Sequence, residues 1–143
     1  MSIDYSSLGK AINRLEKSIQ YADSPTAKVD PGLFEQLRNS VIQCFEFTYE
    51  LSHKLLKRYL EETSASPDEF DLGVFQNLIR IGNEKGMLRS DWPRWKAYRQ
   101  ARADSSHAYD EDKADAVYQI AHDFLIEAGH LYKKLTERSG RES

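Results

Sequence analysis

The sequence predicts an all-α fold, an antiparallel up-down bundle of about five helices. Charged residues make up 30% of the chain, and only 7 glycines and 4 prolines occur among 143 residues, a composition that favours helices. Apolar residues recur three or four positions apart along most of the chain, which is the period of one helix face. No stretch alternates strictly between apolar and polar residues, as a half-buried strand would. The connections are short, so we expect neighbouring helices to pack antiparallel.

Two helices are predicted in the first half of the chain, at residues 4–22 and from Pro31 to about Glu62. The connector between them contains a proline, and the pair Asp30-Pro31 suits the N-cap and first turn of the second helix. Apolar residues at helical spacing give each helix a core stripe. These residues are Ile3, Leu8, Ile12, Leu15 and Ile19 in the first helix, and Leu33, Leu37, Val41, Cys44, Thr48, Leu51 and Leu55 in the second.

Two shorter helices are predicted next, after a loop at residues 63–70 that contains a proline. Asp71 is expected to cap the first of them, and Gly86 is placed to end it. Ser90 or Asp91 is expected to cap the second, in whose first turn a proline is tolerated.

The last helix is predicted to begin behind Asp110, where Glu111 and Asp112 suit the positive end of the helix dipole. We expect a single domain over residues 1–137 and a flexible polar tail over residues 138–143. The core stripe of this helix comprises Val117, Ile120, Phe124, Leu131 and Leu135.

Charge and cysteine content limit the classes of function. A net charge of −3 argues against a general nucleic-acid binder. Cys44 is the only cysteine, which excludes an internal disulfide and fits a reducing compartment. The segment Met1–Lys10 lacks the apolar region of a signal peptide, and no apolar run approaches the ~20 residues of a membrane span. We therefore expect a soluble cytoplasmic protein without a membrane partner.

The turn between the last two helices carries the residues best suited to chemistry. Arg102 ends one helix, His107 follows five residues later, and Tyr109 lies just before Asp110. Helix dipoles explain the bases before this turn and the acids after it, but they require neither a histidine nor a tyrosine. We predict Arg102 and His107 as a catalytic pair. Further candidates for substrate contact are Arg99, Asp104, Ser106 and Asp110.

RNA cleavage is the reaction that such a pair would support. A neutral His107 can take the proton from a ribose 2′-hydroxyl, and the freed oxygen then attacks the adjacent phosphate. Arg102 can bind that phosphate in a bidentate manner and offset the charge that grows on it. The reaction needs no metal, and DNA is not a substrate because it lacks the 2′-hydroxyl.

The sequence also disfavours a metal site. Glu46, Glu50 and His53 have the spacing of helical ligands, yet this pattern is also common on solvated faces that carry lysines nearby. A di-metal bundle would need a second Glu-x-x-His motif, which is absent, and His122 and His130 lie eight residues apart. The chain also lacks a glycine-rich phosphate loop, a nucleophile elbow and zinc spacing, so we expect no metal and no cofactor.

The aromatic residues are expected to serve packing. Phe45, Phe47 and Tyr49 alternate with acids rather than bases, which suits a core or an interface better than a platform for nucleobases. Trp92 and Trp95 are expected to pack at a corner of the bundle.

Two blocks of the sequence resemble the nucleotidyltransferase substrate-binding protein family. The first is residues 41–51, VIQCFEFTYEL, with Lys54 and residues 56–61, LKRYLE, behind it. The second is the more specific and comprises Gly86-Met87-Leu88, Trp95, Arg102, Ser106-His107-Ala108-Tyr109-Asp110-Glu111 and Ala114. The resemblance extends over roughly residues 8–137.

The resemblance implies a HEPN helical bundle that is encoded beside a minimal nucleotidyltransferase (MNT) as the toxin of a toxin–antitoxin pair. It implies that Arg102 and His107 form an Arg-x4-His ribonuclease motif, which a homodimer brings together in one cleft. In some such pairs the MNT partner transfers AMP to the tyrosine two residues after the histidine, here Tyr109, and silences the toxin. Two residues depart from the family pattern: Ala103 replaces a frequent Asn, and His53 replaces a frequent Trp.

Two functions therefore stay open. The first is an RNA-cleaving toxin that uses Arg102 and His107, and the second is a non-catalytic subunit that presents a substrate to a nucleotidyltransferase. A purely structural bundle is disfavoured, because packing requires neither His107 nor Tyr109 in this turn. We favour the ribonuclease.

Overall fold

The computed structural model describes residues 3–63 and 73–142. These residues form six α-helices, one short 3₁₀ turn and no strand, which confirms the predicted all-α class. The elements are α1 (Ser6–Ala22), α2 (Pro25–Lys28), α3 (Pro31–Thr63), α4 (Phe75–Glu84), α5 (Trp92–Asp104), η2 (Ser105–His107) and α6 (Glu111–Glu142). Within the described ranges no helix combines the length and the apolar content needed to cross a membrane.

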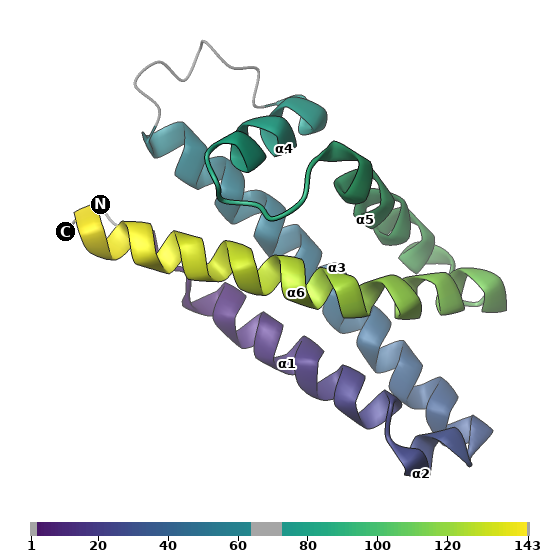
Figure 1. Cartoon of the computed structure of the whole chain (residues 1–143). Helices are drawn as coiled ribbons and strands as arrows, with labels where there is room; N and C mark the ends of the chain where they lie inside the picture. The colour runs from purple at the N-terminus through teal and green to yellow at the C-terminus, as the bar shows by residue number, and fades with distance from the viewer. Residues whose placement is uncertain (1–2, 64–72, 143) are drawn as a thin grey trace.

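Three long helices form the body of the molecule (Figure 1). α1 runs antiparallel to α3 and packs along it, and α6 packs against both. α5 lies on α6 and also contacts α3, while α4 packs on α5 and α3. As a result, the turn from α5 through η2 into α6 lies against α3.

Local sequence signals set several helix ends as predicted. The carboxylate of Asp91 accepts the first backbone N–H of α5 at 2.7 Å. Gly86 adopts a φ of 78°, and behind it the N–H of Met87 donates to the carbonyl of Gly82 at 2.9 Å. This is a Schellman ending, and it needs the left-handed residue that glycine supplies. The carboxylate of Asp110 accepts two backbone N–H groups in the first turn of α6, at 2.9 and 3.3 Å.

Other boundaries differ from the prediction. The connector after α1 contains one helical turn, α2, because its proline occupies the first position and Ser24 Oγ accepts the N–H of Ala27 at 3.3 Å. α6 continues to Glu142, so the helix extends beyond residue 137. Extending an existing helix adds one hydrogen bond for each residue fixed, and the last residues include good helix formers. Asp71, the predicted cap of α4, lies outside the described residues.

The buried face of α3 is wider than the predicted stripe. Val41, Thr48 and Leu55 are buried as predicted, whereas Leu33 is 36% exposed and Phe45 is fully buried. The reason is that α1, α5 and α6 all contact α3, so that its buried surface extends around the helix beyond a single stripe.

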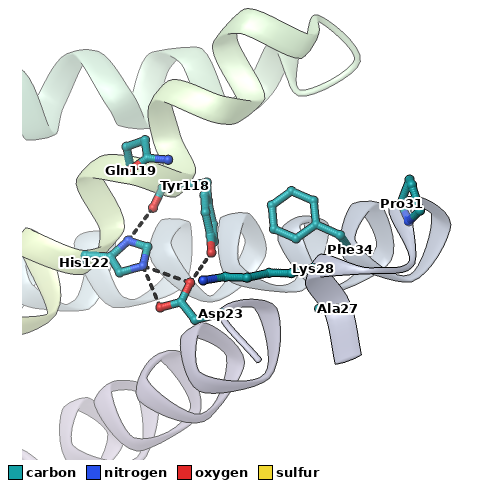
Figure 2. A pocket seen from close by; sticks show the side chains of 8 residues that line it. All are labelled: Asp23, Ala27, Lys28, Pro31, Phe34, Tyr118, Gln119 and His122. Atoms are coloured by element: carbon teal, nitrogen blue, oxygen red, sulfur yellow. Dashed lines mark hydrogen bonds and ion pairs between the residues drawn. The ribbon is translucent and has the colours of Figure 1, made fainter. Parts of the chain in front are cut away.

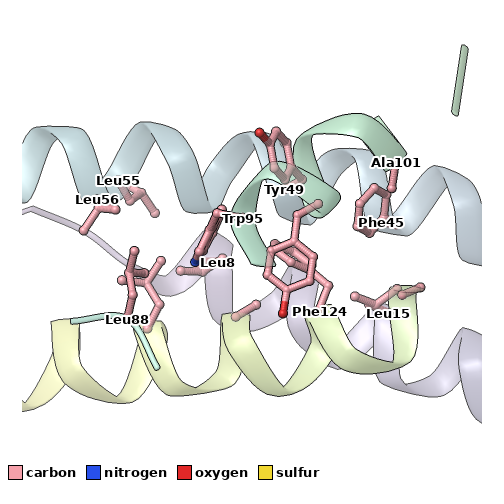
Figure 3. Close-up of a cluster of buried hydrophobic side chains, with 14 of the residues drawn as sticks. Leu8, Leu15, Phe45, Tyr49, Leu55, Leu56, Leu88, Trp95, Ala101 and Phe124 are labelled. Atoms are coloured by element: carbon pink, nitrogen blue, oxygen red, sulfur yellow. The ribbon is translucent and has the colours of Figure 1, made fainter. Parts of the chain in front are cut away.

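An aromatic cluster joins α3, α5 and α6 (Figure 3). The ring of Phe124 on α6 lies 5.2 Å from Phe45 and 5.7 Å from Trp95, and Trp95 lies 6.2 Å from Tyr49. These packed rings hold α5 against α3, and they thereby fix where the end of α5 lies. Phe47, on the same helix, points away from the core and is 56% exposed.

Candidate active site

The candidate site is built on the connection between α5 and α6. α5 ends at Asp104, the 3₁₀ turn η2 follows directly, and α6 begins at Glu111. The hydroxyl of Ser105 donates to the carbonyl of Arg102 at 2.6 Å, and the N–H of Asp110 donates to the carbonyl of His107 at 3.0 Å. These bonds keep the chain close to helical geometry, so the predicted residues project from one compact turn.

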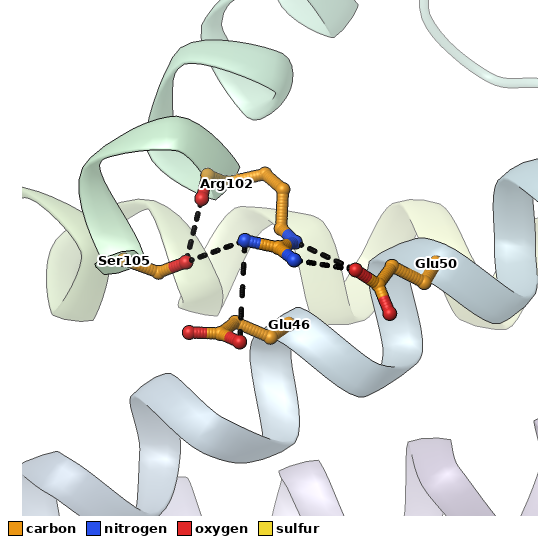
Figure 4. Close-up of polar contacts among 4 residues, drawn as sticks. All are labelled: Glu46, Glu50, Arg102 and Ser105. Atoms are coloured by element: carbon orange, nitrogen blue, oxygen red, sulfur yellow. Dashed lines mark hydrogen bonds and ion pairs between the residues drawn. The ribbon is translucent and has the colours of Figure 1, made fainter.

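Arg102 is held by acidic side chains of α3 (Figure 4). Its Nε and Nη2 both donate to Oε1 of Glu50, at 3.1 and 2.5 Å. Its Nη1 donates to Ser105 Oγ at 3.3 Å and lies 4.0 Å from Oε2 of Glu46. The hydrogen bond to Glu50 is the largest cause of a raised pKa for the guanidinium, which therefore stays charged.

These contacts restrict how Arg102 can bind an anion. A guanidinium has five N–H donors, and the Nε edge that would grip a phosphate is occupied by Glu50. The Glu50 side chain is 58% exposed, so it can turn into solvent without leaving a buried charge behind. A phosphate that binds Arg102 along this edge must therefore replace one carboxylate.

His107 has the opposite environment. It is exposed at the end of η2, and within the described residues its imidazole has no hydrogen-bond or ion-pair partner. Its ring meets that of Tyr109 edge to face, with centroids 5.9 Å apart. Tyr109 is 85% exposed. Both rings are thus open to an incoming molecule, and the imidazole has a nitrogen available to accept a proton.

The structure brings only some of the predicted residues together. Arg102 and His107 share the turn but make no direct polar contact, and Ser106 is exposed beside His107. Asp104 accepts a hydrogen bond from Gln100 at 3.0 Å, and Arg99 lies over the ring of Phe75 at 5.3 Å. Asp110, described above, caps α6. Arg99, Asp104 and Asp110 thus each have a local structural role.

Sequence reasoning missed three groups of this site. The sequence indicates Glu46 and Glu50 only as metal ligands or solvated residues, and it favours Ser106 over Ser105 for substrate contact. The available signal was a pair of acids four residues apart on α3 and an arginine elsewhere with opposite charge. The spacing of apolar residues cannot relate these acids to the arginine, because it does not show that α5 packs on this part of α3.

The histidines whose spacing suggests metal ligands make contacts with protein groups instead. The ring of His53 packs on Phe75 at 4.8 Å, and burial is the main cause of its lowered pKa. In the described ranges no three His, Cys, Asp or Glu residues are arranged to hold a metal ion. His130 Nε2 lies 3.3 Å from the carbonyl of Gly86.

His122 belongs to a separate polar cluster beside a cavity of about 630 Å³ (Figure 2). Its Nε2 lies 2.9 Å from Asp23 Oδ2, its Nδ1 lies 2.9 Å from the carbonyl of Tyr118, and the Tyr118 hydroxyl donates to Asp23. Asp23 is the C-cap residue of α1, so the cluster joins the end of α1 to α6.

Comparison with known proteins agrees with this architecture. Residues 3–137 match the model of a family described as nucleotidyltransferase substrate binding protein like. A protein of Haemophilus influenzae named probable ribonuclease HepT is 36% identical over 134 residues, which cover 92% of this chain and 91% of the relative. A solved Haemophilus influenzae structure superposes with a TM-score of 0.84 at 35% identity, over 93% of this chain and 99% of that one. It is described as the fold of a substrate binding domain of a nucleotidyltransferase.

Proposed function

The chain belongs to the nucleotidyltransferase substrate binding protein like family, and we propose that it is a HEPN-type endoribonuclease that uses Arg102 and His107 without a metal. The observation that carries the proposal is the free, exposed imidazole of His107 in the turn that begins behind Arg102. A histidine that serves packing would be buried or hydrogen-bonded, and this one is neither. The name of the Haemophilus relative gives independent support for ribonuclease activity.

The proposed reaction is transfer within the RNA strand. Neutral His107 removes the proton of a ribose 2′-hydroxyl, and the 2′-oxygen forms a bond to the adjacent phosphorus. The bond from phosphorus to the 5′-oxygen of the next nucleotide breaks, and a general acid gives that oxygen a proton. The products are a 2′,3′-cyclic phosphate and a 5′-hydroxyl. Arg102 exchanges Glu50 for the phosphate and stabilises the charge that grows on it.

The need for a general acid leads us to propose that the protein acts as a homodimer. One protomer offers a single histidine in this turn, whereas the reaction benefits from both a base and an acid. A two-fold axis near the turn would supply His107 of a second copy as the acid. The high exposure of His107 and Tyr109 leaves this surface open for such an arrangement.

The proposed regulation depends on an MNT nucleotidyltransferase as the antitoxin partner. The Tyr109 hydroxyl attacks the α-phosphorus of ATP, pyrophosphate leaves, and the phenol loses its proton. The 85% exposure of Tyr109 and its contact with the His107 ring support this proposal. The attached phosphodiester carries one negative charge that would compete for Arg102, and the adenosine would hinder RNA entry.

The decisive experiment incubates the purified protein with RNA in the presence of EDTA. We expect cleavage with 2′,3′-cyclic phosphate ends and none of the matched DNA. His107→Ala and Arg102→Ala should each lower the rate by about 10²- to 10⁴-fold. His130→Ala, in the part of α6 that contacts the α4–α5 connection, is the matched control and should keep full activity. Cleavage that persists in His107→Ala would refute the assignment.

The modification has its own test. Incubation with an MNT partner, ATP and Mg²⁺ should add one or more AMP units in wild type and none in Tyr109→Phe, which should still cut RNA. Equal modification of the Phe variant would show that Tyr109 is not the acceptor.

A second candidate function is a non-catalytic subunit that presents a substrate to a nucleotidyltransferase. It is favoured by the description of the similar Haemophilus structure as a substrate binding domain. In that case the protein alone leaves RNA intact, and its addition changes which molecule the nucleotidyltransferase modifies.

A further inference from the structure

A second feature of the site is a cavity of about 380 Å³ between α3 and the turn that precedes α6. Two of the residues that line it, Glu46 and Ser105, are also contacts of Arg102, at 4.0 and 3.3 Å. The cavity therefore begins one side chain away from the guanidinium. A phosphate that binds Arg102 would therefore lie beside this cavity.

The lining combines apolar surface with hydrogen-bonding groups. Ile42 and Ala108 supply apolar surface, and the exposed ring of Tyr109 supplies a flat face of the kind on which bases stack. Asn39 and Gln43 lie one helical turn apart on α3 and contribute two amides, each with donors and acceptors. A flat ring with polar edges suits this lining better than a purely apolar ligand does.

The charges disfavour an anionic group inside the cavity. Three carboxylates line the cavity, those of Glu35, Glu46 and Glu111. Glu111 is paired with Arg38 at 2.9 Å, and Glu46 lies 4.0 Å from Arg102. Two of the three charges are thus offset by arginines. The carboxylate oxygens remain acceptors, so the cavity suits a neutral group that carries N–H donors.

We propose that this cavity binds the base of an RNA nucleotide next to the cleaved phosphate and prefers a base with an exocyclic amine, with adenine as the base to test. The exocyclic amine of adenine would donate to an amide or carboxylate oxygen, and a ring nitrogen would accept an N–H of Asn39 or Gln43. Uracil has no exocyclic amine and is disfavoured. The proposal rests on the proposed function, since it takes Arg102 as the phosphate site.

The test uses DNA oligonucleotides that carry a single ribonucleotide, so that cleavage occurs at one phosphate. The base on each side of that phosphate is varied in turn among adenine, uracil and unsubstituted purine, which differs from adenine only by the missing amine. We expect adenine at one of the two positions to be cleaved about tenfold faster than purine. Gln43→Ala should reduce this preference to less than threefold, while Gln36→Ala, an exposed site on the same helix, should preserve it.

Binding separates this proposal from the nuclease proposal. Fluorescence anisotropy with the matching all-DNA strands, which cannot be cleaved through a 2′-hydroxyl, should show the same adenine preference and the same dependence on Gln43. If the wild-type protein cleaves adenine and purine strands equally at both positions, the base-site proposal is wrong, and the ribonuclease proposal is unaffected. Adenine-dependent binding without any RNA cleavage supports the base site and refutes the ribonuclease. Binding of an arginine-rich peptide that requires Gln43, without any base preference, assigns the cavity to a protein partner and overturns the proposal.

Discussion

At the scale of single residues, two carboxylates of α3 compete with an RNA phosphate for Arg102. Glu50 binds the guanidinium along its Nε edge, and Glu46 lies 4.0 Å from Nη1. Both acids keep the long arginine side chain in one position, which favours orientation. Both charges also repel an incoming RNA strand, and Glu50 occupies donors that the phosphate needs. In the proposed reaction, the affinity for RNA therefore depends on how much more strongly Arg102 binds the phosphate than it binds Glu50.

Glu50→Gln should tighten RNA binding. The substitution keeps an acceptor for Arg102 but removes the charge that the phosphate must displace. Because Glu50 is 58% exposed, its pair with Arg102 is screened by solvent, and we expect only a two- to fivefold decrease in Kd, about what a partly exposed ion pair contributes. Fluorescence anisotropy with uncleavable RNA measures this Kd, and Glu62→Gln, at the far end of α3, is the control. Weaker binding by Glu50→Gln would mean that orientation of Arg102 outweighs competition.

At the scale of elements, α6 also holds the connection between α4 and α5, through two hydrogen bonds to its backbone. The buried carboxylate of Glu127 accepts the N–H of Arg89 at 2.9 Å, and Arg138 donates to the carbonyl of Lys85 at 2.6 Å. Sequence periodicity predicted these helices and several of their caps, because capping and helical spacing are local properties. It did not predict that Glu127 is fully buried, since this depends on a contact between segments 38 residues apart.

Glu127→Gln should stabilise the fold near neutral pH. Burial is the largest cause of a raised pKa for Glu127, and one of its oxygens is buried without a hydrogen-bond partner. A carboxyl with a raised pKa in the folded state favours folding when protonated, and this advantage is lost as the pH rises through the folded pKa. Glutamine stays neutral and keeps an acceptor for Arg89, so the variant should melt a few degrees higher at pH 7.

The pH dependence provides the check. The gain in Tm should shrink as the pH falls from 7 through the raised folded-state pKa of Glu127, because the folded protein then protonates Glu127 itself. Glu137→Gln, a partly exposed residue of the same helix, is the control and should change the melting temperature little at either pH. A lower Tm for Glu127→Gln at pH 7 would mean that its charge is needed beside Arg89.

At the scale of the whole molecule, the sequence points to candidate residues more readily than to their arrangement. Arg102, His107 and Tyr109 are candidates because they occupy one short segment with unusual chemistry. Glu46 and Glu50 reach Arg102 only because the aromatic cluster of α3, α5 and α6 packs α5 against α3. Contacts between distant segments depend on this packing, and no local pattern encodes them. The same reasoning applies to the proposed homodimer, because contacts between two copies of the chain would also depend on packing that no local pattern encodes.

Mixing wild type with His107→Ala tests whether two copies share one cleft. If each cleavage needs His107 from both protomers, as base and as acid, only dimers of two wild-type chains are active. After subunit exchange at equal concentrations, dimers of two wild-type chains make up about one quarter of all dimers, so the activity should be about one quarter of that of the same total amount of wild-type protein. Independent sites would instead leave about one half of that activity. Single-turnover RNA cleavage distinguishes the two values, and sedimentation at micromolar concentration must show the dimer. Activity that stays at one half, or a monomer at these concentrations, would mean that a single chain supplies both proton transfers, with water or another group of the turn as the acid.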